Sequence, residues 1–207
     1  MRAPSISFLE RTLQPTDEAV AVDQAGHAVV AVALGCTLRL VTLEPDVVNP
    51  GRVDFDPPQE IEVTRYRHVG RGPSERVRET TEEEQQADAL RQWFHLQAVV
   101  WAAGGCALAR RAQMRPRSVG DPPAMTGLVD LDVASIAMCA KAAGLGLVGS
   151  RADAFERKAT ARAERLLRVP HVWAAVGVLT SRLLMARTLS GAQATAIVQP
   201  MLTGCLS

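Results

Sequence analysis

The stretch from Asp17 to Leu34, DEAVAVDQAGHAVVAVAL, decides how the rest of the chain is interpreted. Beyond its first turn it is apolar nearly all round, so it predicts a helix that is buried on every side. The acidic start suits the positive end of the helix dipole, and Gly35 is a typical stop. Only three polar side chains interrupt its interior, Asp23, Gln24 and His27.

Asp23 and His27 are four residues apart, which places them on one face of this helix, one turn from each other. Gln24 lies on the flank of the same face. A buried charge is costly unless it is paired or bound to a metal ion. Two interpretations follow from the spacing alone. Asp23 accepts a hydrogen bond from His27 and only stabilises the helix, or both residues belong to a metal site.

The composition of the chain limits its domain number and its possible partners. The chain has 207 residues, 47% of them hydrophobic and 4% aromatic, which fits one domain with a core of Ala, Val and Leu. The formal net charge of +1 predicts no overall attraction to nucleic acid or to an anionic membrane. No apolar run reaches the roughly 18 residues of a membrane span. No phosphate-binding loop of the G-x-x-x-x-G-K-[ST] type occurs, so no ATP is expected.

The cysteines are distant from one another in the sequence. This spacing excludes the usual structural zinc motifs and gives no disulfide framework, so we expect a reduced, cytoplasmic setting. The four residues are Cys36, Cys106, Cys139 and Cys205.

The pattern along the chain predicts an α+β fold that is mostly α. We expect an arm over residues 1–16 and a single domain over 17–207, with loops at 70–86 and 113–127. Strands are predicted at 39–44 and 61–67, with turns and loop between them because of their prolines. Helices are predicted at 82–112, where Gly104 and Gly105 favour a kink, and at 130–146, 153–168 and 171–186. A last helix begins at Ser190, which forms a capping box with Gln193.

The segment from Asp23 to Ala28 resembles the zinc helix of the FtsH-type ATP-dependent metallopeptidases, which reads His-Glu-Ala-Gly-His-Ala. Other pieces resemble later parts of the same peptidase domain, in the same order along the chain. They are Leu38–Pro45, Thr81–Ala107, Asp130–Ala134 and Arg187–Gly191. The resemblance implies a small N-terminal β-sheet with a buried zinc-type helix, followed by a helical bundle.

The resemblance also implies site residues. In the family, two histidines one turn apart bind zinc, and the glutamate takes a proton from the metal-bound water. Here His27 and Asp130 stand at ligand positions, Asp23 replaces the first histidine and Gln24 replaces the glutamate. A neutral amide has no useful basicity. A site of Asp23, His27 and Asp130 predicts weak zinc binding, manganese, or no metal. His95 is an alternative ligand if its helix packs over the site.

Two functions follow as expectations. The first is a non-catalytic interaction or regulatory module with a metallopeptidase-like fold and a protein or peptide partner. The alternative is a metal-dependent peptidase that uses Asp23, His27 and Asp130 and cuts only flexible peptides, because no ATPase accompanies it. Both are compatible with homo-oligomers.

Overall fold

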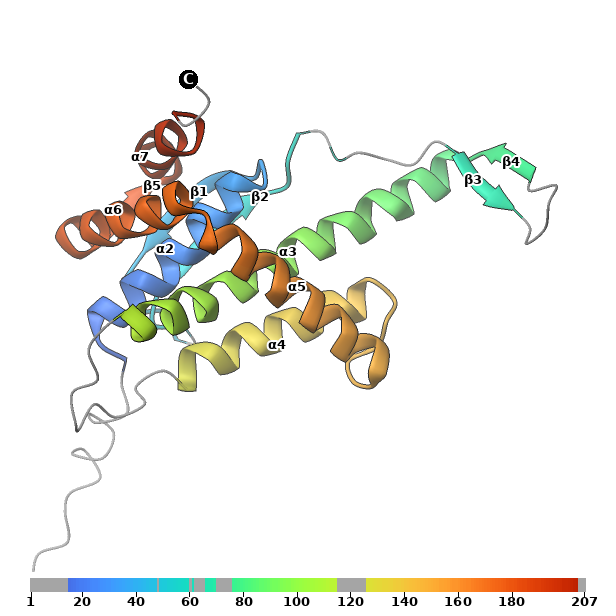
Figure 1. Cartoon of the computed structure of the whole chain (residues 1–207). Helices are drawn as coiled ribbons and strands as arrows, with labels where there is room; N and C mark the ends of the chain where they lie inside the picture. The colour runs from blue at the N-terminus through green and yellow to red at the C-terminus, as the bar shows by residue number, and fades with distance from the viewer. Residues whose placement is uncertain are drawn as a thin grey trace, which may run out of the picture.

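The computed structural model describes residues 15–47, 49–59, 61, 66–69, 76–114 and 126–204 (Figure 1). It is mostly helical with a small antiparallel sheet, which confirms the predicted α+β class. The elements are α2 (Asp17–Ala33), β1 (Thr37–Thr42), β2 (Arg52–Asp56), β3 (Tyr66–Val69), β4 (Arg76–Glu79), α3 (Glu82–Met114), α4 (Thr126–Ala142), α5 (Ser150–Arg168), α6 (Pro170–Ala186), β5 (Thr188–Ser190) and α7 (Gly191–Thr203).

Helix α2 lies at the centre of the fold. Every residue from Val20 to Val32 is buried, because α3, α6 and the sheet all pack against this helix. The Thr16 side chain caps its start by accepting a hydrogen bond from the backbone of Ala19. At its end Gly35 adopts a φ of +81°, which turns the chain into β1. The sequence prediction of a fully buried helix is therefore confirmed.

The sheet has the order β2-β1-β5, with β1 antiparallel to both neighbours. Val41, near the end of β1, is opposite Val53 of β2 and Leu189 of β5. The region of β2 was predicted as turns and loop, and this prediction was wrong. Val53 is buried and Phe55 half-buried, and charged residues alternate with them, the period of a strand with one face toward the core.

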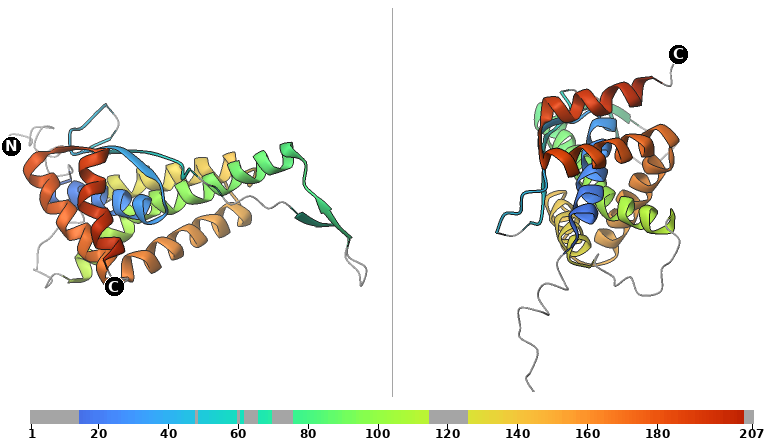
Figure 2. Two further views of the ribbon diagram at one scale, coloured as in Figure 1. Left: turned by 90° about the horizontal axis from the view of Figure 1, so that it is seen from above. Right: turned by 90° about the vertical axis from the view of Figure 1, so that its left-hand side faces the viewer.

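Helix α3 has 33 residues and continues without a break through Gly104 and Gly105, where a kink was expected. Gly104 instead serves close packing of α3 against α2, because a Cβ there would collide with Asp23 and His27. A Cβ on Gly26 of α2 would stand 2.7 Å from the Cβ of Ala107 and 2.8 Å from the carbonyl oxygen of Ala103. The beginning of α3 extends away from the other helices toward the β3–β4 hairpin (Figure 2).

The remaining helices agree with the sequence pattern to within a few residues at their ends. The capping box of α7 is present, since Ser190 and Gln193 each accept a hydrogen bond from the other's backbone. Residues 1–14 of the arm predicted at 1–16 and residues 115–125 of the loop predicted at 113–127 lie outside the described residues, as does most of the strand expected at 61–67.

Over the residues that the structure describes, no single helix combines the length and apolar character needed to cross a membrane. Helices α5 and α6 reach that composition only when taken together, and they are bent by 87° at their junction.

Candidate metal centre

His27 is 2% exposed and is held by a backbone carbonyl of the neighbouring helix. Its Nδ1 lies 2.7 Å from the carbonyl oxygen of Val100 in α3. Because a carbonyl oxygen only accepts, Nδ1 must carry the proton in this contact. The ring also meets Trp101 edge-on, with 5.5 Å between the ring centroids. These two contacts fix the imidazole so that Nε2 faces away from Val100.

Two carboxylates face this Nε2 atom. Oδ2 of Asp23 lies 3.4 Å from it and Oδ1 of Asp132 lies 3.3 Å from it. One ligand atom from each of the three residues can be chosen so that all lie within 4.8 Å of one another. The other carboxylate oxygens, Oδ1 of Asp23 and Oδ2 of Asp132, are buried and have no hydrogen-bond partner among the described residues.

The third residue is Asp132, whereas the resemblance implied Asp130. Asp130 is exposed, because residues two apart on a helix point in nearly opposite directions. The sequence does contain the signal for Asp132. Leu128, Asp132 and Ile136 are spaced by four, and all three are buried on the face of α4 that packs on the core. The match to a short motif favoured Asp130, and the helical period favours Asp132.

Gln24 and His95, the other residues singled out from the sequence, lie differently. Gln24 is 5% exposed, and its amide donates a hydrogen bond of 2.9 Å to Oδ2 of Asp23, so it holds this carboxylate in place. His95 is exposed and stacks on Phe155 of α5, with 4.5 Å between ring centroids. It therefore does not supply a further ligand to the centre.

The side chains of the centre carry a net negative charge unless a cation or additional protons are bound. Burial alone would lower the pKa of His27, but the carboxylates of Asp132 and Asp23 outweigh it and raise that pKa well above 6.5. Burial raises the pKa of Asp132 above 3.8, although His27 opposes this shift. With a neutral imidazole the trio carries two negative charges, which one divalent cation would neutralise.

The two Nε2 distances fall in the range of long hydrogen bonds and also match the spacing of donor atoms around a metal ion. A charge-assisted N–H···O bond spans about 2.7–2.9 Å, shorter than both Nε2 distances. Donors that are each about 2.0–2.1 Å from a tetrahedral ion are about 3.3–3.4 Å apart. Metal-binding histidines usually donate their other N–H to a carbonyl or carboxylate, as Nδ1 of His27 does. Gly104 lies directly against the centre, because a Cβ there would collide with Nε2 of His27 and Oδ1 of Asp23.

A pocket of about 440 Å³ opens onto the centre. Strand β2 forms one wall and Trp101 forms part of another. Two further carboxylates line this pocket, and each is paired with an arginine: Asp54 with Arg52 and Asp56 with Arg39. All three residues of the centre line this pocket.

No protein-family model matches the chain, and no curated protein matches it.

Proposed function

We propose that this chain is a metallopeptidase-like domain that holds a divalent metal ion at Asp23, His27 and Asp132 and binds a peptide or protein segment without cutting it. The arrangement around His27 carries the proposal. Its Nδ1 is committed to Val100, and its Nε2 faces two carboxylates that each keep a buried, unpartnered oxygen. Such oxygens are rare unless something else satisfies them.

The absence of a suitable base supports binding over cleavage. Gln24, which stands where the resemblance implies the catalytic glutamate, is a neutral amide already bonded to Asp23. The other described carboxylates of the pocket, Asp54 and Asp56, are neutralised by arginines. An ion at the centre would supply a Lewis-acidic position for a carbonyl or carboxylate oxygen of the partner.

The wall of the pocket favours an extended peptide as the bound segment. Strand β2 is at the edge of the described sheet and pairs only with β1. An edge strand presents unpaired N–H and C=O groups that a peptide can use by adding a further strand. Along that edge the ion pairs Arg52–Asp54 and Arg39–Asp56 offer both signs of charge to the segment.

The proposal is tested by metal binding and by proteolysis in parallel. Protein stripped with a chelator is titrated with Co²⁺ and Zn²⁺ and followed by calorimetry and by the visible spectrum of Co²⁺. We expect one site per chain, lost in His27→Gln. Casein should remain intact with and without metal. Metal-dependent cleavage of casein, abolished by the same substitution, would show that the chain is a peptidase and not a binding module. Equal metal binding by parent and variant would show that His27 does not belong to a metal site.

A further inference from the structure

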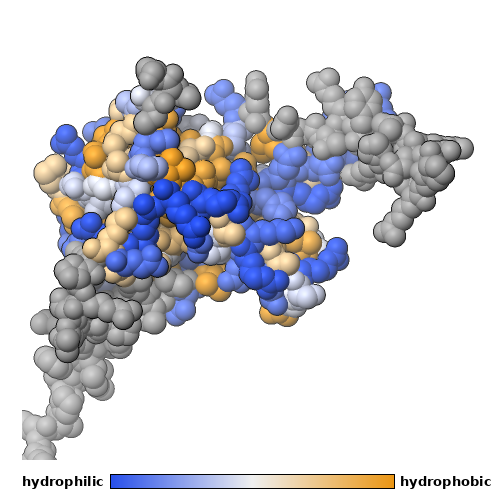
Figure 3. Space-filling view, viewed as in Figure 1, coloured by the Kyte–Doolittle hydropathy of each residue, from blue (hydrophilic) through white to orange (hydrophobic). Residues whose placement is uncertain are grey.

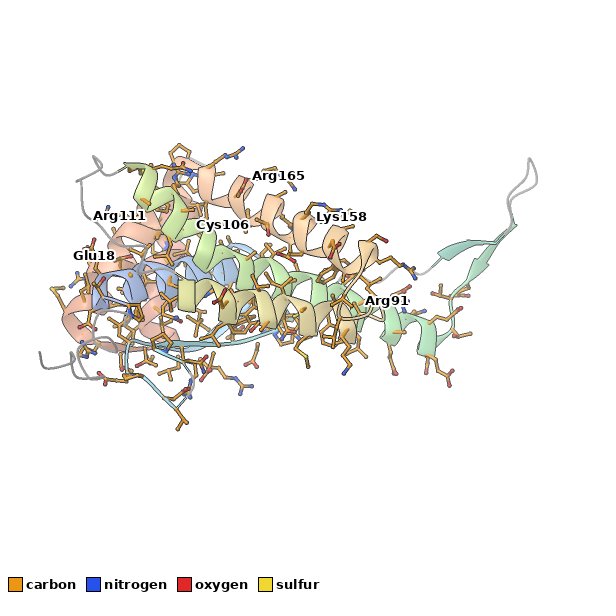
Figure 4. All side chains as sticks on the ribbon, turned by 90° about the horizontal axis from the view of Figure 1, so that it is seen from below. Glu18, Arg91, Cys106, Arg111, Lys158 and Arg165 are labelled. Carbon is orange, nitrogen blue, oxygen red and sulfur yellow. The ribbon has the colours of Figure 1, made fainter. Side chains whose placement is uncertain are left out.

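Helix α5 carries a stripe of basic residues that the metal centre does not require. Lys158, Arg162 and Arg165 follow one another at helical spacing on one side of the helix. Glu156 and Glu164 lie on the other side, where they line a pocket shared with α4. Figure 4 shows Lys158 and Arg165 along α5, and Figure 3 shows that hydrophilic residues gather over this helix.

The basic stripe borders a groove of about 550 Å³ between α5 and α3. Its rim carries positive side chains and its floor carries small apolar ones, and none of its described lining residues is acidic. The cationic residues of the rim are Arg157, Lys158, Arg162 and Arg165, with His95 facing them from α3. The floor consists of Val99, Ala154, Ala159 and Ala161.

These cations are unpaired in the part of the chain that the structure describes, unlike others on the same helices. Arg168 pairs with Glu164, and Arg91 pairs with Asp88. The pKa of the surface residue His95 is lowered, first by partial desolvation of its ring against the neighbouring helix and then by the positive charges of Lys158 and Arg162. The groove therefore contains like charges that repel one another, and an anion placed among them would relieve that repulsion.

We propose that the groove between α3 and α5 binds an acidic polypeptide segment of a partner protein, with carboxylates at the cationic rim and small apolar side chains on the alanine floor. The helical spacing of the stripe places its charges about one turn apart, a repeat that acidic residues on a partner helix can match. Nucleic acid fits less well. The net charge of +1 gives no wider field to attract a phosphate backbone, and His95 is the only ring among the described lining residues.

The site is independent of the metal centre. Asp132 lines the pockets on the far side of α5 and beside α2, and neither it nor His27 lines this groove. Loss of metal binding would therefore leave binding in the groove unaffected.

The test uses a fluorescein-labelled peptide of alternating Glu and Ala residues, measured by fluorescence anisotropy on the full chain. The double variant Lys158→Glu/Arg162→Glu is compared with Lys141→Glu/Arg182→Glu, which makes the same change of net charge at exposed positions of α4 and α6. We expect the groove variant to bind about tenfold more weakly or worse, because two ion pairs become repulsions, and the control to bind like the parent. A Lys/Ala peptide should bind the groove variant in preference to the parent.

Two results would overturn the proposal. Equal losses in both double variants would mean that only net charge attracts the peptide. Tighter binding of a labelled oligothymidylate than of the acidic peptide, abolished by the groove variant, would assign the groove to nucleic acid instead. Circular dichroism of both variants checks that the helices are intact, and stronger binding of the Lys/Ala peptide to the groove variant than to the parent confirms a folded groove that has lost its net positive charge.

Discussion

Gly104 of α3 faces His27 of α2 with no room for a side chain between them. A Cβ on Gly104 would collide with Nε2 of the imidazole and with Oδ1 of Asp23, and it would stand 2.6 Å from Cε1 of His27. The helices approach each other closely at this point, and Gly26, the residue before His27, allows the same close approach to Ala103 and Ala107 of α3. The close approach of α2 and α3 at this point therefore requires a residue without a side chain at position 104.

Gly104→Ala should lower both stability and metal binding. The added methyl group enters an already filled site, so α3 must shift, at a cost of about 1–3 kcal/mol in the free energy of unfolding. Gly177→Ala is the matched control, because Gly177 is helical, exposed and has nothing within 4 Å of a new Cβ. It should be neutral or stabilising by about 0.5–1 kcal/mol. Urea unfolding of both variants measures the difference, and equal stabilities would mean that the two helices are not so closely packed.

The aspartates of α4 provide a second matched pair. Asp132→Asn should weaken metal binding strongly, whereas Asp130→Asn should bind like the parent, because only Asp132 faces Nε2 of His27. Carboxylates bind divalent ions far better than neutral amides, so we expect a loss of about tenfold or more. Calorimetric titration with Zn²⁺ measures both variants. A loss confined to Asp130→Asn would restore the assignment that the motif resemblance implied.

The sequence predicted well that the central helix is buried together with Asp23, Gln24 and His27, because a run of apolar residues is a local signal that tertiary contacts do not alter. It predicted less well what depends on distant partners. Strand β5 has three residues, and only its pairing with β1 reveals it. The hydrogen bond between Nδ1 of His27 and the carbonyl of Val100 joins residues 73 positions apart, so no local pattern encodes it.

The protonation of His27 predicts that the stability of the fold depends on pH, in opposite directions without and with a bound metal ion. The imidazole has its pKa raised in the folded state by Asp132 and Asp23, against the effect of burial. Without metal, its stabilising charge is fully present below about pH 6.5 and is lost as the pH rises through the raised folded-state pKa. In a chelator, the stability difference between the parent and His27→Gln should therefore be largest below about pH 6.5 and should shrink as the pH rises above it.

With a divalent ion the trend should be opposite. The ion requires a neutral imidazole and ionised carboxylates, so its binding releases protons and tightens as the pH rises. Metal-dependent stabilisation should accordingly grow over the same pH range. Unfolding midpoints with chelator and with excess Mn²⁺ give the two slopes. The same downward slope in both would indicate that the centre is filled by protons, with His27 as an imidazolium between Asp23 and Asp132.

Zinc binding by the unaltered chain should be weak and readily reversed. One imidazole and two carboxylates form a donor set richer in oxygen than zinc prefers, and Mn²⁺ should compete with Zn²⁺ for it. Metal analysis after dialysis against a mild chelator should find less than one zinc ion per chain. Full zinc occupancy after that treatment would contradict the expectation and would strengthen the peptidase alternative.

Repair of the centre is the most demanding prediction. The double substitution Asp23→His/Gln24→Glu restores His-Glu-x-x-His spacing on α2, and with Asp132 it offers zinc two imidazoles and one carboxylate. Zinc affinity should rise about tenfold or more, measured by competition with a chromophoric chelator. Part of this gain in zinc affinity will be offset by overpacking against α3, because Asp23 is 2% exposed and the new ring is larger.

Asp23→His alone is the control for the double substitution. It should gain zinc affinity but leave casein intact, because the glutamate that could accept a proton from water is missing. A repaired variant that folds like the parent but binds zinc no better would show that His27, Asp23 and Asp132 form a buried hydrogen-bonded trio and not a metal centre.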